Sequence, residues 1–248
     1  MLEQLETIPV WDGLKSDSEC FLCSLMEEAE KDGIRYYLSS AIMTPEVRVK
    51  TNEYGFCPKH SLDMAAALKP QPLSLVMDTY YEEERKLLQS DFDRMKSASN
   101  PRKAQKILSS LFDIVDDREK GCLVCSRMKE RLDRYTFTIA SLFGEDAEFR
   151  AALKNSKGFC LHHSKALYLM APEALKGDML LDFYRTISDL MERNLERVQK
   201  DDWWMSQKYK SENREKPWNG CEDASYRAVF KLVGKARIID PVNEKKRK

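Results

Sequence analysis

Apolar side chains recur every three or four residues along most of the chain, a spacing typical of helices that bury one face. One long stretch with this spacing and without Gly or Pro runs over 73–97, and a second, longer stretch runs from 173 to about 210. No segment has the strict alternation that predicts a strand. The pattern therefore predicts an all-α fold with long antiparallel helices.

Proline and glycine divide this helical pattern. Pro70 and Pro72 separate a short helix from a long one, and Pro172 lies at the matching place in the second half. Residues 1–17 contain Pro9 and Gly13 and are predicted to be an extended N-terminal lead-in. The charged segment 116–120 is predicted to connect the two halves, and the basic tail 240–248 is predicted to be disordered.

The two halves carry the same motif, N-x-x-G-F-C-x-x-H, at 52–60 and at 155–163. A C-x-x-C pair precedes each copy at nearly the same distance, since 57 − 23 is 34 and 160 − 125 is 35. Self-similarity of this kind indicates an internal duplication. We predict a first helical zinc-binding repeat over 18–118 and a second over 119–239.

Charge and hydropathy narrow the class of protein. Lys plus Arg and Asp plus Glu are both 41, so there is no overall field that would draw the chain to nucleic acid, and we expect none to bind. The sequence contains no run of 18 apolar residues, so we expect no membrane-spanning helix. The first residues lack the basic and apolar regions of a secretory signal, so we expect a cytoplasmic protein.

The cysteines indicate metal binding. Their number, seven, is odd, and six of them lie in C-x-x-C or C-x-x-H segments, which suits reduced thiols that hold an ion better than disulfides. Cys thiolates and His nitrogens are the ligands of structural zinc. We therefore expect two Zn²⁺ per chain, one held by each repeat: the first by Cys20, Cys23, Cys57 and His60, and the second by Cys122, Cys125, Cys160 and His163.

The residues beside the ligands fit such sites. Each C-x-x-C pair lies near a predicted helix start, where free amide hydrogens stabilise thiolates. Gly55 and Gly158 are predicted to have positive φ just before a ligand, and Phe56 and Phe159 to shield the ions.

Other interpretations of these residues stay open. The cysteines could be reduced core residues, a redox pair or iron–sulfur ligands, although two separated pairs that include a His fit zinc better. His162 has Lys59 as its counterpart in the first repeat and is predicted to be a non-ligand. Cys221 has no partner in the pattern and is predicted to be a small buried hydrophobe.

Three segments are typical of a known family: Thr7-Ile8-Pro9-Val10, Cys20-Phe21-Leu22-Cys23 and Met43-Thr44-Pro45-Glu46-Val47-Arg48, which runs on to His60. In these segments the chain resembles bacterial proteins grouped as domain of unknown function family 6062. The second copy departs from the pattern, because no Pro-x-Val-Arg precedes Asn155. The resemblance implies no particular activity, since that family has none established.

Three hypotheses of function follow. The first is a non-enzymatic helical zinc protein whose long helices bind a protein partner or a second copy as a homodimer. The second is a thiol-based redox or metal-responsive switch that releases zinc on oxidation. The third, zinc-dependent nucleic-acid binding, is disfavoured by the neutral net charge. An enzyme stays open if Arg48, His162 or a helix-lined pocket holds a substrate, although no catalytic motif indicates one.

Overall fold

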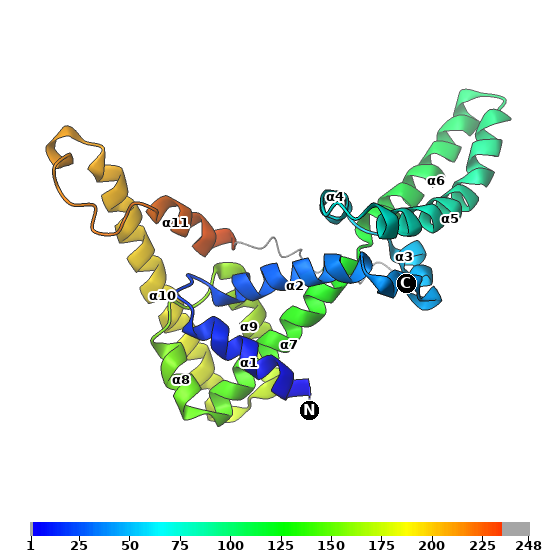
Figure 1. Ribbon diagram of the computed structural model, residues 1–248. Coiled ribbons are helices and arrows are strands. Elements are labelled where there is room, and N and C mark those ends of the chain that lie inside the picture. The colour runs from blue at the N-terminus through cyan, green and yellow to red at the C-terminus, as the bar shows by residue number, and fades with distance from the viewer. Residues whose placement is uncertain (1, 235–248) are drawn as a thin grey trace. The chain divides into compact units, whose positions relative to one another are not determined.

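A computed structural model of the chain describes residues 2–234, and this part is all-helical as predicted (Figure 1). It contains eleven α-helices, two short 3₁₀ helices and no strand. No helix within it is long and apolar enough to cross a bilayer. The α-helices are α1 Leu2–Lys15, α2 Phe21–Tyr37, α3 Pro45–Tyr54, α4 Pro58–Ala66, α5 Pro70–Lys96, α6 Pro101–Lys120, α7 Leu123–Glu145, α8 Ala147–Lys154, α9 Leu161–Ala174, α10 Gly177–Lys208 and α11 Ala224–Val233, and the 3₁₀ helices are η1 Ser40–Met43 and η2 Ser211–Asn213.

The described chain forms two compact units that differ from the two predicted repeats. The first unit contains residues 2–29 and 129–234, and the second contains 30–128. Both changes from one unit to the other fall inside a helix, in α2 and in α7. Each unit is therefore built from parts of both halves of the sequence. The repeats 18–118 and 119–239 stay a prediction about the duplication of the sequence, and the tail 240–248 lies outside the described residues.

The first unit has a well-filled core. Helix α10 packs against α9 and α11, and its Phe183 meets Phe143 of α7 edge-on with ring centroids 5.1 Å apart. Trp11 of α1 contacts Phe149 of α8 in the same way, at 5.2 Å. Burial of such large aromatic side chains is the main stabilising contribution in a helical core.

The prediction of an extended lead-in over 1–17 was wrong, because residues 2–15 form helix α1 despite Pro9 and Gly13. Val10 and Leu14 are buried one turn apart, and buried Glu6 lies one turn earlier on the same face. The Glu6 carboxylate accepts from Arg134 at 3.0 Å. Tertiary packing of this face overrides the local cost of proline and glycine within a helix.

The second unit contains a long hairpin of α5 and α6, which lie side by side in Figure 1. Asn100 caps α6, and its side chain accepts from the Lys103 amide at 3.0 Å. The segment 116–120, predicted to be a connector, is instead the last turn of α6. Two pairs of side chains fix the register of the antiparallel helices: Glu84 with Arg118 at 2.6 Å, and Asp91 with Ser110 at 3.1 Å.

Candidate metal centres

The eight predicted ligands lie at the starts of four helices. Helices α2 and α7 begin directly after Cys20 and Cys122, and α4 and α9 begin directly after Cys57 and Cys160. The second ligand of each pair follows three residues later, so both side chains project from one helical turn. The Cys160 sulfur accepts from the His163 amide at 3.4 Å. Free amides and the helix dipole at these starts favour the thiolate form.

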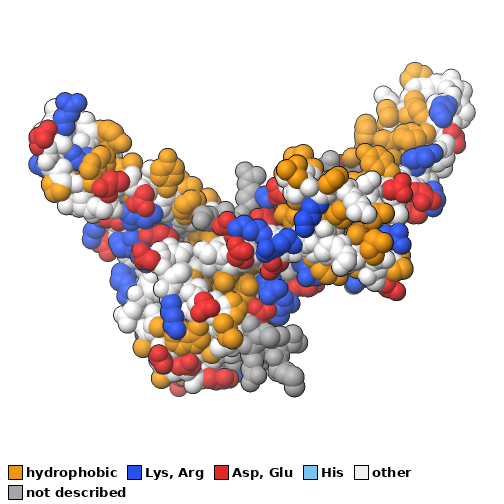
Figure 2. Space-filling model, in the orientation of Figure 1, with side chains coloured by type: hydrophobic (Ala, Val, Ile, Leu, Met, Phe, Trp, Pro, Cys, Tyr) orange, Lys and Arg blue, Asp and Glu red, His pale blue; other side chains and the backbone are white. Residues whose placement is uncertain are grey.

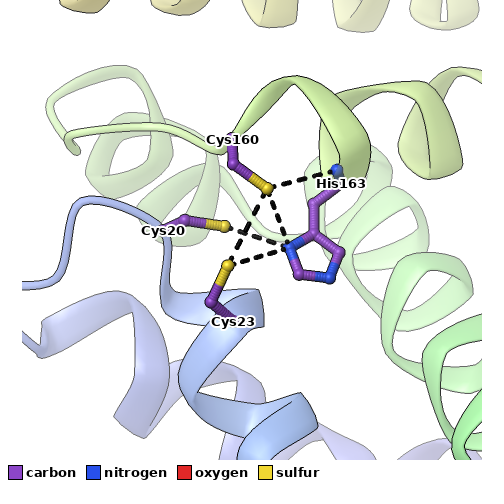
Figure 3. Close-up of side chains that lie close together, drawn as sticks. All are labelled: Cys20, Cys23, Cys160 and His163. Carbon is purple, nitrogen blue, oxygen red and sulfur yellow. Dashed lines mark hydrogen bonds between the residues drawn. The ribbon is translucent and has the colours of Figure 1, made fainter. Parts of the chain in front are cut away.

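The first unit contains one group of four, which we call the buried cluster: Cys20, Cys23, Cys160 and His163. Figure 3 shows the sulfurs of Cys20 and Cys23, at the start of α2, facing Cys160 and the ring of His163 at the start of α9. The three sulfurs lie 3.2, 3.4 and 3.3 Å from His163 Nδ1. None of the four side chains is more than 3% exposed.

The second unit contains the other group, which we call the half-exposed cluster: Cys57, His60, Cys122 and Cys125. Here the three sulfurs lie 3.2–3.3 Å from His60 Nδ1, and the sulfurs of Cys57 and Cys125 are 3.9 Å apart. His60 is fully buried, but Cys57 and Cys125 are only partly buried. The same ligand types thus occur in two surroundings that differ in access to solvent.

The spacing in both clusters fits a single tetrahedral ion. Metal bonds of about 2.3 Å to sulfur and about 2.0–2.1 Å to nitrogen, the values for zinc, place tetrahedral ligands about 3.8 Å (S to S) and about 3.5 Å (S to N) apart. The observed sulfur distances are 3.8 and 3.9 Å, and none of these cysteines forms a disulfide. The ligand atoms of each group all lie within 4.8 Å of one another. Each group could therefore hold a metal ion.

The predicted assignment of ligands to ions was wrong, although the same eight residues gather. Each repeat was expected to hold its own ion, yet Cys20 and Cys23 lie with Cys160 and His163, and Cys122 and Cys125 lie with Cys57 and His60. The two halves exchange their C-x-x-C pairs. Since both C-x-x-C pairs and both C-x-x-H segments are alike, either assignment gives each ion the same ligand types with the same spacing inside each motif, and only the paths of α2 and α7 decide between them.

The flanking glycines and phenylalanines take their predicted roles unequally. Gly55 and Gly158 have φ of 59° and 71°, which confirms that the backbone turns in the left-handed region just before a ligand. Phe159 is buried, with its ring centroid 5.0 Å from that of Phe21. Phe56 is only partly buried, with its centroid 5.2 Å from that of Tyr37. Aromatic shielding is thus more complete at the buried cluster.

Glu30 orients the histidine of the half-exposed cluster, a role that the sequence analysis missed. Its carboxylate lies 2.9 Å from His60 Nε2 and 2.6 Å from the Lys59 ammonium. A carboxylate that accepts from Nε2–H fixes the tautomer in which Nδ1 is free to bind a metal. Hydrogen bonds from His60 and, to a smaller extent, from Lys59 lower the pKa of Glu30 to about 2, although partial burial opposes this shift. The carboxylate therefore stays ionised.

The buried cluster has no such acceptor for its histidine. His163 Nε2 is buried and finds no hydrogen-bond partner among the described residues. The signal was present in the sequence: the seventh residue after the second cysteine of the pair is Glu30 in α2 and Leu132 in α7. One half therefore supplies a carboxylate at this position, and the other supplies an apolar side chain.

Lys231 of α11 supports the buried cluster in another way, also missed from the sequence. Its side chain is 2% exposed and its ammonium donates to the carbonyls of Glu19, at 2.7 Å, and of Lys157. These residues immediately precede Cys20 and Gly158, so a single lysine holds both ligand-bearing loops. Burial lowers its pKa, and the nearby charge of Glu19 partly opposes that shift.

The clusters have unusual proton affinities when no metal is bound. Burial lowers the pKa of His60, but hydrogen bonds with Cys122 and Glu30 outweigh it and raise this pKa to about 10. At His163, hydrogen bonds with Cys160 and Cys23 outweigh burial in the same way and raise the pKa to about 9. Hydrogen bonding to Cys125, against burial, lowers the pKa of Cys122 to about 4. Each metal-free group thus keeps an imidazolium beside a thiolate: Cys122 in the half-exposed cluster and, in the buried cluster, Cys23, whose pKa is lowered by hydrogen bonds with Cys160 and Cys20 against burial.

The remaining candidates lie outside the two clusters. His162 is not a member of either, although its ring lies 5.8 Å from that of His163, centroid to centroid. Cys221 is buried and belongs to no metal-binding group of the described residues, as predicted. Glu30, His60 and Asp63 also lie close together, but they share His60 with the half-exposed cluster.

Comparison with known proteins gives one result. Neither the curated proteins nor the solved structures contain a match. Residues 1–238, however, match the model of a family described as "Family of unknown function (DUF6062)". The match spans both copies of the motif, all eight cluster residues and Lys231. The chain therefore belongs to this family, DUF6062.

Proposed function

We propose that this chain is a non-enzymatic helical zinc protein, in which two structural zinc ions join distant segments and the long helices form a scaffold for protein interaction. The observation that carries the proposal is that three sulfurs and one histidine nitrogen lie within 4.8 Å of one another in each cluster, with one pair of sulfurs 3.8 Å apart in the buried cluster and one pair 3.9 Å apart in the half-exposed cluster. Four protein ligands fill the coordination of zinc and leave no position for a substrate or a reactive water. A structural role follows from a complete ligand set.

Each ion would act as a cross-link between parts of the chain far apart in sequence. The buried cluster joins residues 137–143 positions apart, and the half-exposed cluster joins residues 62–68 apart. Closing such loops costs conformational entropy, which metal binding offsets. Zinc would thereby stabilise the packing of the helix starts, while this chain's own residues orient the ligands and, at the buried cluster, exclude water from the sulfurs.

Metal analysis of protein purified without added metal tests the proposal. We expect two colourless zinc ions per chain, a melting temperature that falls on chelation, and recovery when zinc is returned. Cys221→Ser is a matched control, because this cysteine lies in neither cluster and its loss should leave metal content unchanged. A coloured protein with iron, or a chelated protein that melts unchanged, would exclude structural zinc.

A thiol-based switch is a second candidate, at the half-exposed cluster alone. The observation that favours it is the partial exposure of Cys57 and Cys125, whose sulfurs are 3.9 Å apart. Peroxide would oxidise these two thiolates to a disulfide, itself taking two electrons and two protons to become water, and the ion would leave. Mild peroxide should then release one of the two ions, reversibly with a thiol reductant. Simultaneous release of both ions would reject the switch.

A further inference from the structure

The α5–α6 hairpin is poorly covered for a pair of helices this long. Within residues 85–113, Asp91 and Ile107 are the only buried side chains, and both face the seam between the two helices. Large apolar side chains on the hairpin are exposed to solvent, and Figure 2 shows hydrophobic atoms gathered along it. The most exposed are Tyr81 at 65%, Phe112 at 56%, Leu87 at 45%, Phe92 at 43%, Val115 at 41% and Leu108 at 37%.

All but one of these side chains lie on one face of the hairpin. Relative to the seam residues Asp91 and Ile107, the helical rotation of about 100° per residue puts Phe92 and Leu108 on the same flank of their helices. In two antiparallel helices the corresponding flanks point to the same side. We call this side the apolar face; its members are Tyr81, Leu88, Phe92, Met95, Leu108, Phe112 and Val115.

The opposite face of the same hairpin is polar apart from Leu87. It presents Glu83, Ser90 and Arg94 from α5, and Lys106, Asp113 and Asp117 from α6. One hairpin thus has two faces of different chemistry, although neither carries a ligand of a metal cluster. A helix that is apolar beyond its seam needs a second partner surface to bury the extra stripe.

Charge along the hairpin identifies that partner. The tip, residues 93–106, has five basic residues and one acidic residue. The part below it, residues 82–92 and 107–118, has seven acidic and three basic residues. A hairpin with a basic tip and an acidic base is complementary to a second copy that runs in the opposite direction, since each tip then lies over the other base.

The register agrees with that arrangement. Asp91 is level with Ser110 and Glu84 with Arg118, so the apolar face is centred near the level of Gln89. A two-fold axis at that level brings Lys96 of one copy to the level of Glu82 of the other. The same operation lays each apolar face on its equivalent, which is the geometry of an isologous contact.

We propose that the apolar face binds the same face of a second copy, with the hairpins antiparallel, to form a four-helix bundle. The face is about 25 Å long over Tyr80–Lys96 and two helices wide, which buries on the order of 1,000 Å² in total. That area reaches the lower limit of specific interfaces. A second copy would be the partner in the scaffold role proposed above; because metal content and oligomeric state are measured separately, either can fail without the other.

Sedimentation equilibrium of the full chain tests the contact. The wild type should be a dimer at micromolar concentration, and the double variant F92S/F112S should dissociate at least 100-fold more readily with helix content unchanged by circular dichroism. Leu87→Ser is the matched control on the polar face, where a leucine of similar exposure should not affect the dimer. A monomeric wild type, or a double variant as dimeric as the wild type, would overturn the proposal.

Charge reversal tests the orientation and does not depend on the apolar substitutions. K96E/R102E at the tip and E82K/D116K at the base should each weaken self-association, because like charges then meet at both ends. Mixing the two variants should restore a heterodimer, which also shows that both are folded. If each variant dimerises as the wild type does, or if the mixture stays monomeric, the antiparallel arrangement is wrong.

Discussion

The buried cluster and the half-exposed cluster each have three cysteines and one histidine at helix starts, but their surroundings differ. In the buried cluster Lys231 holds the two ligand loops through their carbonyls, and His163 Nε2 has no acceptor among the described residues. In the half-exposed cluster Glu30 orients His60, while two sulfurs remain partly accessible. The comparison teaches that a ligand motif defines which ion can bind, whereas its surroundings decide how the ligands are positioned and how exposed they are.

Removal of one ligand should have the largest effect and should separate the two clusters. Cys160→Ala and Cys57→Ala are each expected to lose one of two ions, and Cys160→Ala should destabilise the protein more because Cys160 is fully buried. The longer loop closed at the buried cluster adds only about 0.6 kcal/mol, since loop-closure cost grows slowly with length. Metal analysis and urea unfolding measure both quantities. If the two variants were equally destabilised, the burial of Cys160 would not make its cluster contribute more to stability.

The pH dependence of stability should differ with and without metal. Below the raised pKa values of about 9 and about 10, metal must displace a proton from each histidine, so affinity should rise at least tenfold per pH unit in either cluster. Without metal, the raised pKa of His60 contributes stability that is lost as pH rises above about 6.5. The lowered pKa of Cys122 contributes stability that grows with pH up to about 9, the ordinary value of a cysteine, so the two shifts offset each other and the stability of the metal-free half-exposed cluster should change little between pH 6.5 and pH 9. Urea unfolding of chelated and metal-bound protein at pH 6 and pH 9 measures both trends. Parallel trends would show that the histidines do not titrate as described.

Loss of the Glu30 carboxylate should affect one cluster only. Glu30→Gln is expected to weaken metal binding at the half-exposed cluster 10–100-fold, the range found when a second-layer partner of a metal-binding histidine is removed. Competition with a coloured chelator measures the affinity of each ion and would distinguish the weakly bound ion from the one whose affinity is unchanged. Glu28→Gln, an exposed neighbour on α2, is the control. Weakening of both ions would mean that Glu30 acts through general stability rather than through His60.

Substitution of Lys231 should have the smallest effect and should fall on the other cluster. Lys231→Met keeps the length of the side chain but leaves the Glu19 and Lys157 carbonyls without their donor, at a cost of about 1–3 kcal/mol. The half-exposed cluster should keep its affinity. An unchanged unfolding free energy would show that water replaces the ammonium at these carbonyls.

The sequence was sufficient to predict the helical class and the eight side chains that gather, because both depend on local spacing. Helical periodicity and the repeated motif are properties of short segments, and Gly55 and Gly158 were recognised from their position before a ligand. The exchange of Cys20 and Cys23 with Cys122 and Cys125 depends instead on where whole helices run, which no segment encodes.

Other features were missed for the same reason. Lys231 lies 212 residues from Glu19, and no pattern links them. Helix α1 was missed because Pro9 and Gly13 disfavour it locally, and its stability comes from the buried face that contains Val10 and Leu14. Glu30 could have been found, since comparison of the two repeats places it opposite Leu132, but the wrong assignment of ligands hid its meaning.

The exchange of the two pairs also sets an order of events during synthesis. The half-exposed cluster has all its ligands once Cys125 has left the ribosome, whereas Cys20 and Cys23 wait for His163, 143 residues behind Cys20. At ordinary rates of translation that wait is on the order of 10–30 s. During that time Cys20 and Cys23 lack the other two ligands of their cluster, so their thiols can be oxidised or can bind a metal ion together with the wrong ligands. The most protected site in the finished protein is therefore the most vulnerable one while the protein is being made.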